Sequence, residues 1–392
     1  MIAGWIGARI FVVPSVCPRC PLSFTTNAAS AQLPATHTPL PMAAPPSLAL
    51  IAAAADRRIR TLLEAELIRW SNIDPDLAAP LSSLRDLVLA GGKRLRPAFC
   101  HWAFVGAGGD PSDPRVVDAG AGLEMLHTFA LVHDDIMDNS RTRRGMDAVH
   151  IQFSDEHRRQ GWQSEERRFG EGVAILVGDM AFVYADQLLE GANPEAIRIF
   201  TELRVEVNIG QYLDLLGTVR GRPTLETAQR ICQYKSGKYT IERPLHLGVS
   251  LMGALALAKF ERALSAYGLP LGEAFQLKDD LLGTLGDNDV IGKPVGDDLR
   301  EGKPTALVAR AIAAATPSQL EVLDGIGSPD LADDQITAIQ QILVDTGAAS
   351  EVSNAIELLR DEALNAISVS GLLPEAVSAL SELAYYVTDR DH

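Results

Sequence analysis

The sequence predicts an all-α protein with about ten or more helices, and three observations carry this prediction. Apolar residues recur at three- and four-residue steps along most of the chain, which is the period of one helix face. The breaks between these segments fall at clusters of Gly, Pro and Asp. No stretch alternates apolar and polar residues over a length that would indicate a strand. We therefore expect a bundle larger than a simple four-helix bundle.

The first helical pattern begins near Asp56, and the residues NIDP at 72–75 stop it. Five longer apolar helices are expected over residues 116–138, 173–190, 196–216, 225–256 and 260–282. The run 245–258 is apolar on most sides and belongs at the centre of the bundle or in a subunit interface. Residues 146–172 are polar, and we expect a loop there that could include a short helix.

The composition limits the possible functions. The 392 residues are 47% apolar, enough for a large core, and carry a net charge of −16. That charge argues against binding to nucleic acid or to an anionic membrane surface. No apolar run approaches the roughly 20 residues of a membrane span, so we expect no stable membrane insertion. Four cysteines are too few for a disulfide framework, which fits a reducing compartment, and we expect a cytoplasmic protein.

Residues 1–50 differ from the rest of the chain because they contain no Asp, Glu or Lys and many Pro, Ala, Ser and Thr. We expect a disordered or adventitious extension there, with Met42 as a candidate true start. Residues 51–392 would form one all-α domain. A targeting peptide is the alternative, although such peptides usually contain more Arg than this segment does.

The stretch LVHDDIMDNSRTRRG carries the clearest chemical signal. Asp134 and Asp138 lie one helical turn apart on the same face, with Asp135 beside them. Such a cluster attracts a divalent cation, and oxygen-only ligands suit Mg²⁺. Arg143 and Arg144 follow as permanent cations suited to phosphate oxygens. The stretch indicates a metal-assisted diphosphate site, whereas the plainer alternative is a solvated, charged helix end.

Two features upstream point to the same chemistry. The turn GGKRLRP carries Lys93 and Arg96 after two glycines that let the backbone approach a ligand. It favours a second diphosphate site over an exposed basic turn. His127 lies nearly two helical turns before Asp134 on the same face, which favours ligand contact over a core position.

Polar residues also interrupt an apolar helix at YKSGKY. Lys235 and Ser236 lie where the helix should be buried, and buried polar groups are costly unless they are used. The glycine that follows, Gly237, indicates a kink.

The stretch FQLKDD repeats the pattern of an apolar helix that leads into paired acids, here Asp279 and Asp280. Two acidic clusters on two helices can face each other and hold metals between them. Lys293 and Lys303 follow on a Gly-rich segment that could close over a phosphate.

These motifs and their order resemble those of the trans-isoprenyl diphosphate synthases, a family of all-α prenyltransferases. The resemblance runs from about Arg57 to the C-terminus and covers GGKRLRP, HxxxxxxDDIMD with RTRRG, KSG, FQLKDD and GKPVGDDLREGK. Residues 161–179 and the DDLLG variant look most like the actinobacterial geranylgeranyl diphosphate synthases. The resemblance implies an isoprenoid-synthase-type bundle around a central apolar cavity, and a homodimer.

The resemblance also implies roles for individual residues. Asp134 and Asp138 would bind two Mg²⁺ ions that hold an allylic diphosphate, and Asp279 would bind a third, with Mn²⁺ as a substitute metal. Isopentenyl diphosphate would be bound by Lys93, Arg96, His127 and Arg144. The allylic diphosphate would be contacted by Arg143, Lys235, Gln276, Lys293 and Lys303. Ser236, together with Lys235, would lie beside the developing allylic cation.

One departure concerns the second acidic motif, which in the family commonly ends in Asp where this chain has Gly283. Asp280 and Asp287 are candidate substitutes.

The implied reaction joins isopentenyl diphosphate to dimethylallyl, geranyl or farnesyl diphosphate. The metals neutralise the leaving diphosphate, the carbon–oxygen bond ionises, and the double bond of isopentenyl diphosphate attacks the allylic cation. In the family, the residues four and five positions before the first Asp limit the product length. Here they are Ala130 and Phe129. With the actinobacterial resemblance, they favour the twenty-carbon geranylgeranyl product.

Other activities remain open. The product could instead be farnesyl or a longer polyprenyl diphosphate. A class I terpene cyclase shares the first acidic motif, but it would not need the site at Lys93 and Arg96, and it usually carries an N-x-x-x-S/T-x-x-x-E motif that the second half of this chain lacks. A non-catalytic subunit of a heteromeric synthase would typically lose acids that this chain keeps.

Overall fold

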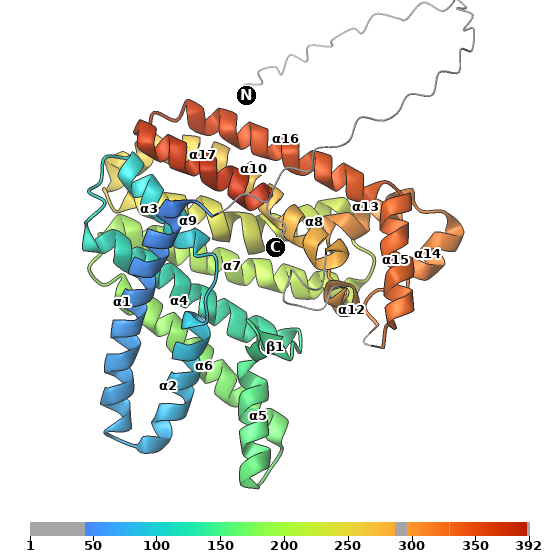
Figure 1. The fold of residues 1–392 in the computed structure, drawn as a ribbon, viewed down its shortest axis with the longest axis horizontal. Coiled ribbons are helices and arrows are strands. Elements are labelled where there is room, and N and C mark those ends of the chain that lie inside the picture. The colour runs from blue at the N-terminus through green and yellow to red at the C-terminus, as the bar shows by residue number, and fades with distance from the viewer. Residues whose placement is uncertain (1–43, 287–295, 329, 390–392) are drawn as a thin grey trace, which may run out of the picture. The chain divides into compact units, whose positions relative to one another are not determined.

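The computed structural model describes residues 44–286, 296–328 and 330–389, and it confirms the all-α prediction (Figure 1). Its helices are α1 (Pro46–Ser71), η1 (Pro75–Leu77), α2 (Ala78–Leu89), α3 (Leu95–Gly106), α4 (Pro114–Met137), α5 (Val149–Gln160), α6 (Glu166–Leu188), α7 (Pro194–Arg220), α8 (Leu225–Ile231), η2 (Cys232–Glu242), α9 (Arg243–Ser250), α10 (Ala254–Leu285), α12 (Asp297–Glu301), α13 (Ala306–Ala314), α14 (Pro317–Leu323), α15 (Asp333–Asp345), α16 (Ala348–Ser368) and α17 (Pro374–Thr388). The strands within these ranges are β1 (Thr142–Arg143) and β2 (Met146–Asp147), an antiparallel pair between α4 and α5.

Four of the five long helices expected from the apolar pattern correspond to α4, α6, α7 and α10. The fifth expectation, one helix over 225–256, is wrong because the chain there forms α8, η2 and α9 and then breaks. Gly253 lies at the break with φ +99°, a backbone conformation that glycine adopts without steric cost.

The prediction that residues 146–172 are mainly a loop is also wrong. Most of it is helical, in α5 and the first turns of α6. Helix α5 buries Val149, His150, Ser154 and His157, and it packs along α6. Since three of these four side chains are polar, the buried face has no apolar periodicity that a sequence reading could detect.

Helix α1 begins inside the segment 1–50 that the composition assigned to an extension. Leu48 is 4% exposed and belongs to the main core, so the packed part of the chain starts a few residues earlier than predicted. Residues 1–43, including Met42, lie outside the described residues, as do Asp287 and Lys293.

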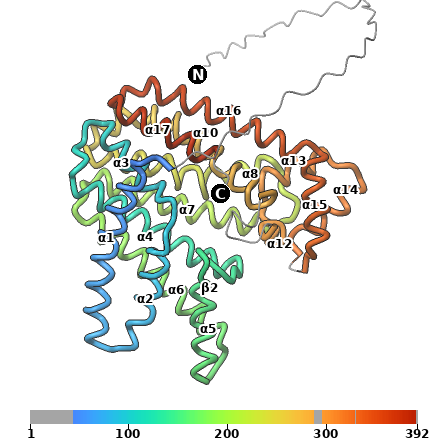
Figure 2. The backbone as a smooth tube through the Cα atoms, viewed as in Figure 1, coloured from blue at the N-terminus to red at the C-terminus, as the bar shows by residue number. Residues whose placement is uncertain are grey.

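The main hydrophobic core joins α1, α3, α4, α6, α7, α9 and α10. A second core lies between α10 and helices α13, α15 and α16. Figure 2 shows α16 and α17, the last helices of the chain, beside α10, and both contact it. Helix α10 therefore connects the two cores, and its C-terminal half carries the second acidic motif.

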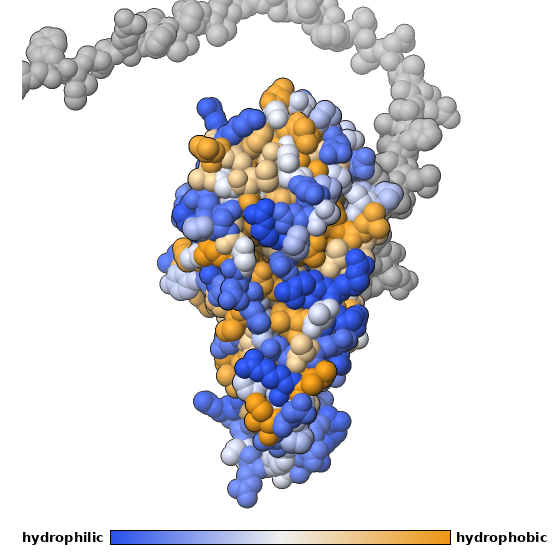
Figure 3. All heavy atoms as spheres, turned by 90° about the vertical axis from the view of Figure 1, so that its left-hand side faces the viewer, coloured by the Kyte–Doolittle hydropathy of each residue, from blue (hydrophilic) through white to orange (hydrophobic). Residues whose placement is uncertain are grey.

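The face shown in Figure 3 has hydrophilic side chains interspersed with separate apolar ones, as expected for a chain with this net charge. Within the described ranges, none of the helices combines the length and the hydrophobicity that crossing a membrane requires.

Candidate active site

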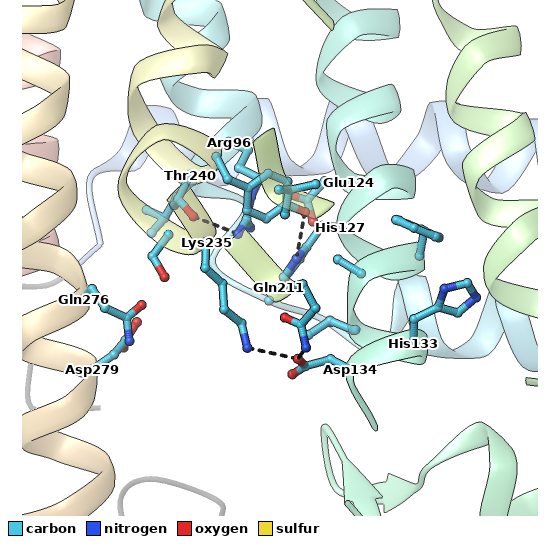
Figure 4. Close-up of a pocket in the computed structure, with 18 of the residues that line it drawn as sticks. Arg96, Glu124, His127, His133, Asp134, Gln211, Lys235, Thr240, Gln276 and Asp279 are labelled. Carbon is cyan, nitrogen blue, oxygen red and sulfur yellow. Dashed lines mark hydrogen bonds and ion pairs between the residues drawn. The ribbon is translucent and has the colours of Figure 1, made fainter. Parts of the chain in front are cut away.

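A cavity of about 360 Å³ brings together motifs that lie far apart in the sequence (Figure 4). Its walls come from the turn before α3 and from α3, α4, α7, η2 and α10. The predicted residues that line it are Lys93, Arg96, His127, Phe129, Ala130, Asp134, Arg144, Lys235, Ser236, Gln276 and Asp279. A second cavity of about 320 Å³ is lined by Arg143 and Lys303 and shares Asp134, Lys235, Ser236, Gln276 and Asp279 with the first. The two cavities therefore adjoin at the acids.

Asp134, near the end of α4, is held by two side chains from other helices. Its Oδ1 accepts hydrogen bonds from Lys235 Nζ at 3.1 Å and from Gln211 Nε2 at 2.8 Å. Lys235 Nζ also donates to Asp214 Oδ2 at 2.6 Å. Figure 4 shows Lys235 extending from η2 toward Asp134. The sequence reading missed Gln211 and Asp214, whose only signal is a pair of polar residues three apart in the long helix α7.

The pKa values of Asp134 and Asp138 shift in opposite directions. Burial and the negative charge of Asp134 raise the pKa of Asp138 to about 7. Burial also raises the pKa of Asp134, but the positive charges of Lys235 and Lys303 outweigh it, so the net shift is downward. Neither cavity, as lined by the described residues, includes Asp138, which caps the C-terminal end of α4.

Asp135, the middle acid of the first motif, has a different partner. Its carboxylate is 1% exposed and forms an ion pair with Arg143, whose Nε lies 2.8 Å from Oδ1. Arg143 Nη2 lies 4.0 Å from Asp134 Oδ2. Asp135 therefore positions Arg143 beside Asp134, which lines both cavities.

Two of the three cations of GGKRLRP, Arg94 and Arg96, have different surroundings. Arg94 has a left-handed backbone with φ 49°, and its side chain is 1% exposed. Its guanidinium pairs with Glu124 at 2.7 Å and with Asp56 at 2.8 Å, so it stabilises the turn. Arg96 instead lies over the ring of Tyr239, 4.3 Å from its centroid.

His127 and Arg144 complete this side of the cavity. Arg144 Nη1 donates to the backbone carbonyl of Leu87 at the end of α2, at 2.9 Å. His127 Nδ1 lies 3.4 Å from the Tyr239 hydroxyl. Burial and the charges of Arg96 and Arg144 hold the pKa of His127 well below its usual value. His127 is therefore a neutral hydrogen-bonding group among cations that suit a diphosphate.

The kink predicted at the KSG sequence is a π-helix, η2. Two glycine contacts let it approach its neighbours closely. A Cβ at Gly210 on α7 would lie 2.5 Å from Lys235 N, and a Cβ at Gly272 on α10 would lie 2.4 Å from Gly237 Cα. Only glycine fits at these positions, so the backbone around Lys235 and Ser236 is set by two neighbouring helices.

Asp280, one candidate for the missing acid near the end of α10, has a side-chain partner on the same helix. Gln276 Nε2 donates to Asp280 Oδ1 at 2.7 Å, and burial raises the pKa of Asp280 to about 8. Asp280 also lines the second cavity and stays a candidate for the missing acid. A different acid, Asp298 of α12, lies close to Gly283, because a Cβ at Gly283 would be 2.6 Å from Asp298 Oδ2. The other candidate, Asp287, is outside the described residues.

The acids of α4 fit Mg²⁺. They offer oxygen donors only, the ligands that Mg²⁺ prefers, and Asp134 and Asp138 repel each other unless a cation joins them. In the described part of the chain, no three His, Cys, Asp or Glu side chains form a ready cluster for a metal ion. Mg²⁺ does not require one, since it is usually held by one or two carboxylates, substrate phosphates and water.

The two residues predicted to limit product length both line the cavity. Phe129 does not stand alone, because its ring packs on His133 at 4.7 Å and on Phe182 of α6 at 4.8 Å between centroids. The sequence reading missed Phe182, which lies 53 residues further along the chain.

Residues 79–343 of the chain match the family model described as polyprenyl synthetase. The chain belongs to the polyprenyl synthetase family. The fold and the enzyme class predicted from the motifs are thereby confirmed, and this polyprenyl synthetase is a prenyltransferase.

Several known members of the polyprenyl synthetase family resemble this chain over most of their length. A crystal structure of geranylgeranyl pyrophosphate synthase from Corynebacterium glutamicum, complexed with isoprenyl diphosphate and magnesium, has a TM-score of 0.82 and 35% identity and covers 88% of this chain and 99% of that one. A geranylgeranyl diphosphate synthase from Saccharolobus solfataricus is 32% identical, covering 78% of this chain and 88% of that protein. A geranylfarnesyl diphosphate synthase from Aeropyrum pernix is 30% identical, and the match covers 84% of this chain and 99% of that protein. Relatives of similar identity are thus named for products of different length.

Proposed function

We propose that this polyprenyl synthetase condenses isopentenyl diphosphate with an allylic diphosphate and releases geranylgeranyl diphosphate as its main product. The observation that carries the proposal is the presence of two separate groups of charged side chains around one cavity, each suited to a diphosphate. One group contains Arg96 and Arg144, and the other contains Asp134 and Lys235. A terpene cyclase, which has one diphosphate substrate, would not need both. The neighbour from Corynebacterium glutamicum holds isoprenyl diphosphate and magnesium.

The residues of this chain account for the steps of the condensation. When bound at Asp134 and Asp138, Mg²⁺ would supply the charge that neutralises the leaving diphosphate. Lys235 and Arg143 add permanent positive charge on the same side, so the C1–O bond can break with its electron pair leaving on the diphosphate.

The second substrate is held on the opposite side of the cavity. Lys93, Arg96 and Arg144 bind the diphosphate of isopentenyl diphosphate and orient its double bond toward C1 of the cation. The π electrons form the new carbon–carbon bond. A proton then leaves C2 for the released diphosphate, and its electron pair becomes the new double bond. His127, which is neutral, can donate a hydrogen bond to isopentenyl diphosphate or accept one from it without adding charge to this side of the cavity.

The product length in this proposal depends on Phe129. The diphosphate is anchored at Asp134, so the hydrocarbon tail extends back along α4, where Phe129 lies about 7–8 Å away at the helical rise of ~1.5 Å per residue. Ala130 leaves the path open on the face of Asp134, and Phe129 narrows it. This arrangement favours the twenty-carbon product over the fifteen-carbon one.

We further propose three metal ions, two at Asp134 and Asp138 and one at Asp279, with Mn²⁺ able to replace Mg²⁺. The family commonly has an Asp where this chain has Gly283. Asp298 would supply the missing carboxylate, since its Oδ2 lies 2.6 Å from the position that a Cβ of residue 283 would occupy. Lys303 Nζ donates to Asp298 Oδ1 at 2.8 Å, which places a cation for the diphosphate beside this acid.

The role of Asp298 has a test that does not depend on turnover. Asp298→Gly should weaken Mg²⁺ binding in the presence of inorganic diphosphate, measured by titration calorimetry. Gly283→Asp in the same chain should restore the affinity, because it returns a carboxylate to that volume. Equal Mg²⁺ affinity in Asp298→Gly and the unaltered protein would exclude the assignment.

We propose that the protein is a homodimer, because the surface of α6 and α7 exposes large apolar side chains. Large apolar side chains are exposed along both helices, including Ile175, Leu176 and Val183 on α6 and Val205 and Tyr212 on α7. A second copy of this chain would bury them. Light scattering on the purified protein checks this, and Val205→Glu should shift a dimer toward monomer. The cytoplasmic location is proposed on the cysteine content alone.

The decisive experiment supplies labelled isopentenyl diphosphate with dimethylallyl, geranyl or farnesyl diphosphate and separates the dephosphorylated products by chromatography. Incorporation of label into a twenty-carbon alcohol is the expected result. Cyclised products from an allylic diphosphate alone would identify a terpene cyclase, and no product from any primer would indicate a non-catalytic subunit. Asp134→Ala should lower incorporation by about 10²–10³-fold. Asp361→Ala on α16, whose side chain is 61% exposed, should leave incorporation unchanged.

A further inference from the structure

We propose that Lys238 and Glu206 are positioning residues for the allylic side of the site, because their ion pair fixes the π-helix η2 on α7 and thereby holds Lys235 in place. Neither residue is among the described residues that line the two cavities, so both would act through Lys235. The inference rests on the proposed contact between Lys235 and the allylic diphosphate.

The π-helix η2 depends on its neighbours for support. It has 11 residues, whereas π-helical hydrogen bonding mostly occurs as a single turn inside an α-helix. Its hydrogen bonds join residues five apart, so its turns are wider than those of α8 and α9 on either side. The contacts that hold η2 against other helices therefore also decide where its side chains lie.

One face of α7 supplies part of this support. Glu206, Gly210 and Asp214 follow one another at four-residue steps, so they lie along the same face of α7. Gly210 lets the two backbones approach closely, because a Cβ there would lie 2.5 Å from Lys235 N. The carboxylates of Glu206 and Asp214 lie one turn before and one turn after this backbone contact.

Each carboxylate on this face of α7 binds a lysine of η2. Lys235 Nζ donates to Asp214 Oδ2 at 2.6 Å. Lys238 Nζ donates to Glu206 Oε1 at 2.7 Å. The lysine side chains are 24% and 16% exposed and the carboxylates 10% and 12%, so both pairs are largely shielded from water. Since the earlier lysine meets the later acid, the two pairs together fix the register of η2 on α7.

Glu206 is itself held by Arg243, the first residue of α9. Arg243 Nε donates to Glu206 Oε2 at 2.6 Å, and its Nη2 donates to Oε1 at 2.7 Å, which is a bidentate pair. The Arg243 side chain is only 9% exposed. Glu206 therefore binds one cation inside η2 and another directly after it, and it keeps a partner when Lys238 is removed.

The register of η2 decides whether Lys235 reaches the acids of α4. Lys235 Nζ lies 3.1 Å from Asp134 Oδ1, and Figure 4 shows the side chain extended toward that acid. Lys238 follows Lys235 by three residues, less than one turn of the π-helix, so a shift of Lys238 also moves the backbone of Lys235. A displacement of about 1 Å in a group that contacts substrate can cost roughly 100-fold in rate.

The test removes Lys238 and leaves Glu206 paired with Arg243, so the protein should stay folded. Lys238→Met should lower kcat/KM for the allylic diphosphate about tenfold or more, measured with saturating labelled isopentenyl diphosphate. Lys238→Arg keeps the charge and should retain most of the activity. The matched control is Arg230→Met on α8, which breaks an exposed ion pair with Glu226 inside one helix and should leave kcat/KM unchanged.

A double-variant cycle separates positioning from general destabilisation. If Lys238 acts through Lys235, adding Lys238→Met to Lys235→Ala should change kcat/KM by no more than about twofold. Lys238→Gln, which can still donate a hydrogen bond, covers a methionine variant that fails to fold. Unchanged kcat/KM in both Lys238 variants, or an equal further loss in the Lys235→Ala background, would overturn the inference. Failure of the unaltered protein to condense the substrates would instead overturn the proposed function.

Discussion

Arg94→Met should destabilise the protein far more than the same change at Arg96, although both residues belong to one basic motif. The Arg94 side chain is 1% exposed and the Glu124 carboxylate is 2% exposed, so the pair is shielded from water. Without Arg94, Glu124 is left as a buried charge with no ionic partner. Asp56, the other partner, is 34% exposed and can be hydrated.

Removing one member of a buried ion pair costs about 3–5 kcal/mol, because the remaining charge stays desolvated. Arg96 donates one hydrogen bond, to Thr240 Oγ1 at 2.9 Å, and its loss should cost about 1–2 kcal/mol together with the contact to Tyr239. The two variants should therefore differ by about 2–3 kcal/mol in the free energy of unfolding.

Urea unfolding followed by circular dichroism at 222 nm measures these free energies. The double variant Arg94→Met/Glu124→Leu should regain much of the lost stability, because apolar residues of similar size can replace a buried ion pair. A loss below about 1 kcal/mol for Arg94→Met, or an equal loss with and without Glu124, would refute the reasoning.

The remaining predictions concern activity. Asp134→Ala should lower kcat by about 10²–10³-fold, measured at saturating Mg²⁺, and near-normal turnover would contradict the role of the α4 acids. Arg96→Ala should raise the KM for isopentenyl diphosphate roughly tenfold or more, since a charge-assisted hydrogen bond is lost; an effect on the allylic substrate alone would reverse the site assignment. Deleting residues 1–41 should leave melting temperature and turnover unchanged, and a large drop in either would show that this segment packs on the domain. Ala130→Phe should shorten the product toward farnesyl diphosphate, as judged by chromatography, whereas an unchanged distribution would move the length limit to another helix.

The sequence alone determined the fold class and the family. The apolar period of α4, α7 and α10 is a local property, because each helix must bury one face wherever it packs. The acids at 134 and 138 share a face through the helical repeat alone. The motif order was enough to recognise the family, and the mismatch at Gly283 was visible without a structure.

What the sequence could not determine are the contacts between residues far apart in the chain. Arg94 and Arg96 are two residues apart, yet Arg94 forms a buried ion pair and Arg96 lies over an aromatic ring. Arg94 precedes the first turn of α3 with a left-handed backbone, whereas Arg96 lies within the helix. Gln211 reaches Asp134 across 77 residues. Asp298 lies at the empty position of Gly283, and Phe182 packs on Phe129, only because α12 packs on α10 and α6 packs on α4. Helix periodicity assigns a residue to a face, but the packing of one helix on another decides which side chains meet there.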